Sequence, residues 1–134
     1  MDIFNNPSIL SVHKALDAAQ LRQHVIANNI ANSTTPGFKK SSVKFEEYLS
    51  SALGRKGISG FRTDARHMPI GSSRFEDVAP RVITHKDSKI NNNKNNVDID
   101  AEMTDLAKTQ IWYDALSTNM NGKFNKLRTA IGGR

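Results

Sequence analysis

The residues best suited to acid–base or metal chemistry are scattered along this sequence rather than clustered. The chain has 134 residues, four histidines and no cysteine. No two histidines stand four residues apart and no His-Glu-x-x-His motif occurs, so the spacing of a helical zinc site is missing. The lack of cysteine excludes disulfides, thiolate metal sites and cysteine nucleophiles. We therefore expect solvated or capping roles for the histidines, which are His13, His24, His67 and His85.

An asparagine-rich stretch is the nearest approach to a calcium loop. Asn91, Asn93, Asn95 and Glu102 fall at positions 1, 3, 5 and 12 of an EF-hand count. Asn96 stands where that loop needs glycine, and neutral amides replace the usual acids, so calcium affinity would be poor. We interpret the stretch as a solvated polar linker. We expect no metal, no cofactor and no catalytic activity.

Two long amphipathic patterns frame the chain. The N-terminal one runs from about Ser8 to Asn32 without Gly or Pro, and Asn6 or Ser8 can cap it with Pro7 in its first turn. The C-terminal one runs from Asp98 to Ile131 with one Gly and no Pro. In both, a seam recurs at gaps of three and four residues, which predicts helices. The seam positions are Ile9, Val12, Leu16, Ala19, Gln23, Ile26 and Ile30, then Ile99, Met103, Leu106, Gln110, Tyr113, Ser117, Met120, Phe124, Leu127 and Ile131.

The middle of the chain has no clear period. Residues 33–37 form a Ser-Thr-Thr-Pro-Gly breaker that ends the first helix, and Val43 to Leu53 fits a short helix. Residues 54–96 read as loop with at most short strands, such as Arg81–His85. We predict a mainly α fold, with long N- and C-terminal amphipathic helices forming a coiled-coil-like pair around an irregular, loop-rich middle. The expected organisation is 1–32, 33–53, 54–96 and 97–134.

Charge and hydropathy limit the classes of function. The net charge of +6 is concentrated in residues 54–96, which carry nine bases and four acids. Their arginines could contact nucleic-acid phosphates, with Phe61 and Phe75 stacking on bases. A basic helical nucleic-acid-binding protein is therefore the alternative function, although no nucleic-acid motif is present and the acids dilute the field. No apolar stretch approaches the ~20 residues of a membrane span, so we expect no membrane insertion.

The seams of the two terminal helices need partners. An intramolecular antiparallel pair is one solution, and packing against other copies in a filament or tube is the other. Only 37% of the residues are hydrophobic, so the core is expected to be thin or shared with other chains. Because helical stability comes mostly from packing, we expect the terminal helices to fray in a dilute monomer.

The residues around the first breaker carry a resemblance to a known family. Residues 25–39 read VIANNIANSTTPGFK. This string resembles the signature of the bacterial flagellar rod, hook and hook-associated axial proteins. Residues 96–103, NVDIDAEM, resemble the start of the family's terminal helix, and residues 123–131, KFNKLRTAI, resemble the end of a short proximal-rod member. The likeness covers about residues 8–53 and 90–132, with Phe38 in place of the commoner Tyr.

The resemblance implies a structural subunit of the proximal rod of the flagellar basal body. Such a subunit would self-assemble through its terminal helices into a torque-transmitting axial tube in the periplasmic space. Implied partners are other rod proteins, the adaptor to the membrane-supramembrane ring and the type III flagellar export apparatus, with no nucleic acid. Residues 1–7 lack a basic region followed by an apolar core, which agrees with export without a Sec signal. Expected assembly residues are the apolar seam positions together with Asn28, Asn29, Asn32, Thr35, Pro36, Gly37 and Phe38.

Overall fold

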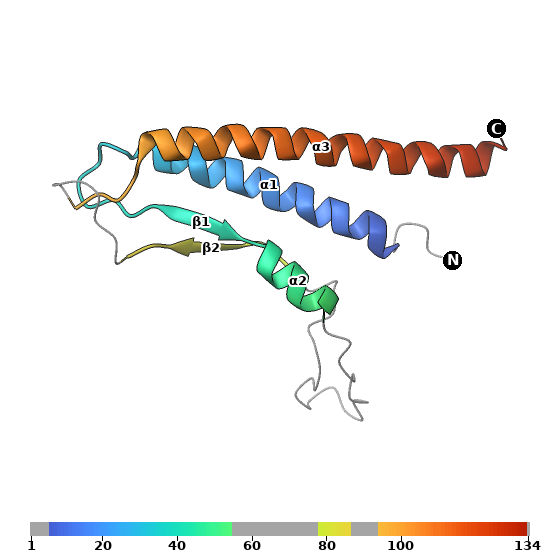
Figure 1. Ribbon diagram of the computed structural model, residues 1–134, viewed down its shortest axis with the longest axis horizontal. Coiled ribbons are helices and arrows are strands. Elements are labelled where there is room, and N and C mark those ends of the chain that lie inside the picture. The colour runs from blue at the N-terminus through green and yellow to red at the C-terminus, as the bar shows by residue number, and fades with distance from the viewer. Residues whose placement is uncertain (1–5, 55–77, 87–93, 134) are drawn as a thin grey trace, which may run out of the picture.

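A computed structural model describes residues 6–54, 78–86 and 94–133. Two long helices run side by side in opposite directions, so the start of the first and the end of the last lie at the same end of the molecule (Figure 1). This confirms the predicted fold class. The elements are α1 (Pro7–Ala31), β1 (Ser41–Lys44), α2 (Glu46–Gly54), β2 (Arg81–Thr84) and α3 (Ile99–Gly132).

Both long helices begin at the predicted caps. The Asn6 side chain accepts a hydrogen bond from the Ser8 N–H, and Pro7 occupies the first helical turn of α1. The Asp98 carboxylate accepts from the N–H groups of Asp100 and Ala101 at the start of α3. At the far end Gly133 adopts a φ of 66°, which only glycine takes without strain, and this residue ends α3.

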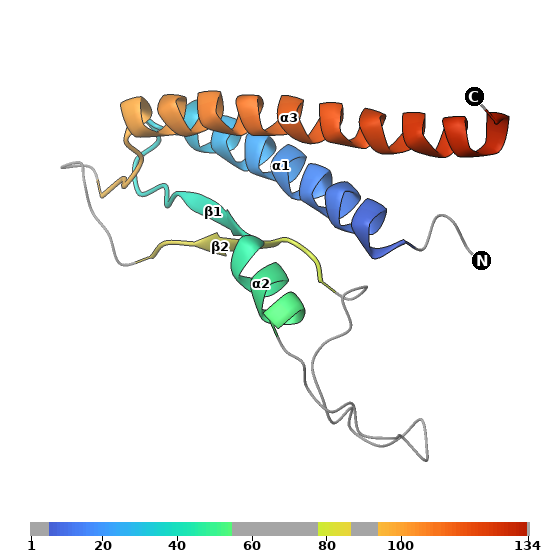
Figure 2. The same ribbon diagram turned by 45° about the vertical axis from the view of Figure 1, so that its right-hand side comes forward.

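Helix α1 lies between two layers. Helix α3 covers one side of it, while the β1–β2 sheet and α2 lie on the other side (Figure 2). The buried core of that second side is formed by Ala18 of α1, Phe45 and Val78, with Leu49 of α2 packed against it. Helix α1 therefore carries two buried faces, whereas the sequence pattern identified one.

The short sheet replaces part of an expected helix. Strands β1 and β2 pair antiparallel, with Val43 opposite Val82. We expected a helix from Val43 to Leu53, but α2 begins only at Glu46. The reason is that Val43 and Phe45 are buried at alternate positions, the period of a strand, before the chain turns into α2. The expected strand at 81–85 is confirmed as β2, one residue shorter.

The packed seam of α3 differs from the expected one because every second position is shifted by one residue toward the N-terminus. From Glu102 to Leu127, α3 carries a heptad series of buried and half-buried residues, of which Glu102 bonds Asn29 and Lys123 bonds Ser8 of α1. This series shares Leu106, Tyr113, Met120 and Leu127 with the prediction. Its other positions are Glu102, Thr109, Leu116 and Lys123. Of the predicted positions, Met103 and Phe124 are exposed instead. Ser117 is half-buried, and Gln110 accepts a hydrogen bond from the predicted seam residue Gln23 of α1 at 3.0 Å.

Much of the basic segment lies outside the described residues. These parts include Arg55, Lys56, Arg62, Arg66 and Arg74, as well as Phe61 and Phe75. Within the described part, the guanidinium of Arg81 stacks 5.3 Å from the ring centroid of Tyr48, where α2 meets β2. His67, Asn91 and Asn93 also lie outside the described residues.

Candidate assembly surface

Four buried polar side chains hold together the end of the molecule where α1 stops and α3 starts. They are Asn29, Asn95, Asn96 and Glu102, and we call them the latch. The Asn29 side chain joins α1 to β1 through both backbone groups of Ser41. Its amide nitrogen donates to the Ser41 carbonyl at 2.8 Å, and its side-chain oxygen accepts from the Ser41 N–H at 3.0 Å. The same amide nitrogen donates to Glu102 of α3 at 2.9 Å. One side chain therefore joins three elements.

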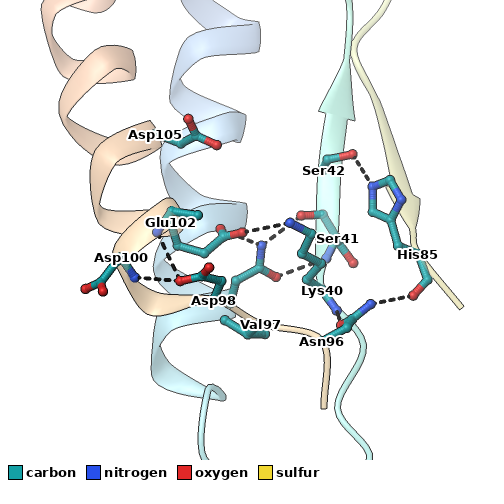
Figure 3. Close-up of polar contacts among 12 residues, drawn as sticks. Lys40, Ser41, Ser42, His85, Asn96, Val97, Asp98, Asp100, Glu102 and Asp105 are labelled. Atoms are coloured by element: carbon teal, nitrogen blue, oxygen red, sulfur yellow. Dashed lines mark hydrogen bonds and ion pairs between the residues drawn. The ribbon is translucent and has the colours of Figure 1, made fainter. Parts of the chain in front are cut away.

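Glu102 is the acidic member of the latch. Its carboxylate points from α3 toward β1, where Lys40 lies 3.7 Å from one oxygen (Figure 3). The other oxygen accepts from Asn29. Because the Glu102 side chain is almost fully buried, both partners are needed to offset the cost of removing it from water.

Asn95 joins the segment before α3 to the turn that follows α1. The Asn95 amide donates to three carbonyls, those of Asn32, Ser33 and Thr35, in the turn that follows α1. Its oxygen accepts from the Val97 N–H. Asn95 thus ties the turn that follows α1 to the segment before α3, across sixty or more residues of sequence.

Asn96 links the same segment to the sheet. Its oxygen accepts from the Lys40 N–H at 2.6 Å, and its amide donates to the His85 carbonyl at 2.8 Å (Figure 3). The interpretation of this stretch as a solvated linker is therefore wrong for Asn95 and Asn96, which are fully buried. Composition misled because consecutive asparagines are common in loops, yet each can also replace three or four backbone partners.

The breaker after α1 forms the expected turn. Asn32 caps the helix, and its amide donates to the Asn28 carbonyl and side-chain oxygen. Gly37 has a φ of 73°, the left-handed conformation that a tight turn demands. Thr35, Pro36 and Gly37 are exposed and Phe38 is half-buried.

An ion pair fixes the second layer on α1. The Arg22 guanidinium donates to both Glu46 oxygens at 2.8 Å and to the Val43 carbonyl at 3.3 Å. Partial burial raises the pKa of the Glu46 carboxyl, but the hydrogen bond from Arg22 and those from backbone N–H groups outweigh burial. The pKa of Glu46 therefore lies below its ordinary value.

The part of the predicted α3 seam that does not face α1 stays exposed. Gln110 and Ser117 of that seam do not belong to this part, because Gln110 accepts a hydrogen bond from Gln23 of α1 at 3.0 Å and Ser117 is half-buried. The exposed members are Ile99, Met103, Phe124 and Ile131. We call this set the free row. Its apolar members are 46–77% exposed, with Ile131 the most exposed. Large apolar side chains exposed toward both ends of a 34-residue helix are a feature typical of an interaction surface.

The structure divides the predicted assembly residues into three groups. Ile26, Asn29 and Met120 are buried. Ile9, Val12, Leu16, Ile30, Asn32, Phe38, Leu106, Tyr113 and Leu127 are half-buried. Asn28, Thr35, Pro36, Gly37 and the four apolar members of the free row are exposed.

Residues of the second α1 face and most of the latch escaped the sequence analysis. The signal for the second face was present: Ala15, Ala18, Arg22, Val25 and Asn29 also recur at gaps of three and four. Alanine and polar side chains made that series look solvated. For Asn95, Asn96 and Glu102 no local signal existed, because their partners come from distant parts of the chain.

The interactions among the described residues are hydrogen bonds, ion pairs and apolar contacts. Within residues 6–54, 78–86 and 94–133, no group of three or more His, Asp or Glu residues is placed to hold a metal ion. In the same ranges, no helix combines the length and apolar character needed to cross a bilayer. The fold and surface define a helix-pair protein whose longest helix keeps an uncovered apolar row.

Comparisons of the sequence with known proteins identify the family to which this helix-pair protein belongs. The sequence model described as "Flagella basal body rod protein" matches residues 11–39. "Flagellar basal body rod protein FlgB" of Bacillus subtilis (strain 168) is 39% identical over 133 residues, covering 99% of this chain and 98% of the relative. The FlgB of Borreliella burgdorferi is 36% identical, covering 85% and 87%, and that of Proteus mirabilis is 32% identical, covering 88% of each.

The chain therefore belongs to the FlgB family of flagellar basal body rod proteins. The family is structural, and its members are components of the basal body rod. The nucleic-acid-binding alternative receives no support from these relatives.

Proposed function

We propose that this chain builds the proximal rod by laying the free row of α3 against neighbouring subunits. One observation carries the proposal: four large apolar side chains, Ile99, Met103, Phe124 and Ile131, remain about half exposed or more on one line of α3. The opposite face of α3 already packs against α1, so the free row is available to other subunits.

The row has the character of an interface rather than of an exposed core. Glu102, Thr109 and Lys123 occupy the inward positions that the free row would otherwise fill. Lys123 bonds Ser8 of α1, and the Thr109 hydroxyl donates to the Asp105 carbonyl. Polar residues of α3 thus face inward with partners, while larger apolar residues face outward. Exposure of those apolar side chains to water costs free energy unless another surface covers them.

The family supplies the setting for this assembly. We infer that the neighbours are other rod proteins, the adaptor to the membrane-supramembrane ring and, during export, the type III flagellar apparatus. The rod would stand in the periplasmic space and transmit torque, without catalysis and without a cofactor.

The proposal is tested by complementation of a strain that lacks the gene. The intact gene should restore swimming and rods on purified basal bodies seen by electron microscopy. Phe124→Asp should fail to restore either, because a charge on the free row would be buried without a partner on assembly. The purified variant should keep the helical circular dichroism of the parent protein, since Phe124 is 46% exposed.

A matched control lies six residues away and about 120° around the helix. Thr118→Asp adds the same charge on an exposed site off the free row and should restore swimming. Normal rods built from Phe124→Asp would overturn the free row as an assembly surface.

A further inference from the structure

The two edges of the small sheet are treated differently by the rest of the chain. Strand β1 lies between α1 and β2 in both views of the ribbon (Figures 1 and 2). On the α1 side, both backbone groups of Ser41 bond the Asn29 side chain, and the Val43 carbonyl accepts from Arg22. Side chains of α1 therefore close the edge that β1 turns toward the helices.

The register of the strands shows which backbone groups of β2 point the other way. The His85 N–H donates to the Lys40 carbonyl at 3.0 Å, so this pair faces inward, and in an antiparallel ladder inward and outward pairs alternate. Val82 and Thr84, the partners of Val43 and Ser41, therefore direct their N–H and C=O groups away from β1. We call these outward groups the open edge.

The open edge has no partner in the part of the chain that the structure describes. Among residues 6–54, 78–86 and 94–133, no hydrogen bond includes the backbone N–H or C=O of Val82 or Thr84. The Val82 side chain is 49% exposed, although it stands opposite the buried Val43. An unpaired strand edge of this kind is a template for another strand.

Contacts at both ends hold β2 in place. At one end the Asn96 amide donates to the His85 carbonyl at 2.8 Å. At the other end the Arg81 guanidinium lies 5.3 Å from the centroid of the Tyr48 ring. A strand that is already fixed loses little further freedom when a partner binds, which favours binding at this edge.

Charge on β2 indicates what kind of strand can join it. Residues 78–86 include Arg81 and Lys86 and no acid. Among the described residues, no ion pair includes Arg81 or Lys86. Bases on an edge strand oppose pairing with a strand of like charge, so two copies of β2 repel each other. An acidic strand would instead be attracted.

We propose, on the basis of the assembly function above, that the open edge takes an extended acidic segment of a different protein as a third strand. The main chain of that segment bonds the N–H and C=O groups of Val82 and Thr84, as in other cases of strand addition. Its carboxylates lie beside Arg81 and Lys86. The contact is separate from the free row, because it belongs to the sheet and not to α3.

The first test removes one hydrogen-bond donor of the open edge in the complemented deletion strain. Val82→Pro deletes an outward N–H, and proline at such a position leaves the β1–β2 ladder intact. It should lower the number of rod-bearing basal bodies about fivefold, because the main chain of the third strand loses a partner. Val82→Thr keeps the N–H and the branched side chain, so it is the matched control and should be near normal.

Two further measurements keep this test decisive. Purified Val82→Pro should keep the circular dichroism of the parent protein, because the preceding residue is already extended in β2. Arg81→Glu leaves every backbone group in place and should also lower the number of rods, whereas Arg81→Lys keeps the charge and should be near normal. Normal rods from both Val82→Pro and Arg81→Glu would overturn the proposal.

The second test measures amide exchange by NMR in the purified full-length protein. Without a partner, the Val82 and Thr84 amides should exchange about tenfold faster than the Ile83 amide, which faces β1. A short capped peptide of alternating Glu and Val, added at millimolar concentration, should slow both amides toward the Ile83 rate. The same peptide with Lys in place of Glu should leave them fast.

Other results would contradict the acidic third strand. Protection of Val82 and Thr84 that rises with protein concentration alone would show that a second copy covers the edge. Equal protection by the two peptides would remove the preference for acids, and protection by neither would remove the edge as a docking site. If the intact gene restores rods in any of these cases, the rod function stands and only the strand addition fails.

Discussion

The two ends of the helix pair are stabilised in different ways. At the end where α1 stops and α3 starts, the latch joins helix, turn and sheet through buried hydrogen bonds. Toward the chain termini the two helices diverge (Figures 1 and 2), and Met120 is the one buried residue of α3 beyond Thr109 among those described. The difference indicates one end that is specified within the chain and one that is left for partners.

The largest effect is expected at the latch. Asn29→Ala removes three hydrogen bonds and leaves the Ser41 backbone groups and the Glu102 carboxylate short of partners. We expect the free energy of unfolding to fall by about 2–4 kcal/mol, measured by urea denaturation. Asn28→Ala, the exposed neighbour on α1, is the control and should cost less than about 1 kcal/mol. Equal losses for the two variants would remove the distinction between a buried latch and an ordinary helix end.

A smaller effect should separate the two ends of α1 in the unmodified protein. Backbone amides from Val12 to Leu16 should exchange with solvent about tenfold faster than those from Val25 to Asn29, because the latter pack against both layers. Hydrogen exchange followed by mass spectrometry or NMR measures this directly. Uniform protection along α1 in dilute solution would contradict both this prediction and the expected fraying of unpartnered helices.

The smallest effect concerns the ion pair between α1 and α2. Because the pKa of Glu46 is lowered in the folded protein, its ionised form stabilises the fold above the ordinary pKa and loses that contribution as pH falls through the folded pKa. Glu46→Gln should cost a few tenths of a kcal/mol at neutral pH, since the pair is largely exposed. The difference from the parent protein should shrink as the pH falls through the folded pKa of Glu46. Glu47→Gln, whose pair with Lys44 lies on the surface, is the matched control.

The two long helices and their limits were readable from the chain alone. Asn6, Pro7 and Asp98 mark helix starts, and Gly37 and Gly133 mark turns, through local backbone chemistry that needs no distant partner. The first seam of α1 and the family resemblance around residues 25–39 were equally local, and both were sufficient to predict a mainly α rod protein.

The sequence was a poorer guide to which face of each element is buried. Hydropathy favoured Met103 and Phe124 over Glu102 and Lys123 as inward positions of α3, and the structure places them the other way. The sequence does not show that Glu102 will meet Asn29 and Lys40, because those partners lie far from it along the chain. Nor does it show that Val43 joins a strand, since β2 begins 38 residues after it.

By itself, the sequence determined where the two long helices begin and end, the absence of thiol chemistry and the membership of an axial protein family. Each of these depends on residue types at short spacing. Only the tertiary structure decided which row of α3 is buried and which is free, and that Asn95 holds the turn after α1 while Asn96 bonds Lys40 and His85 beside the sheet. The physical reason is that a polar side chain is stable inside once its partners surround it, and those partners are brought together only by the fold.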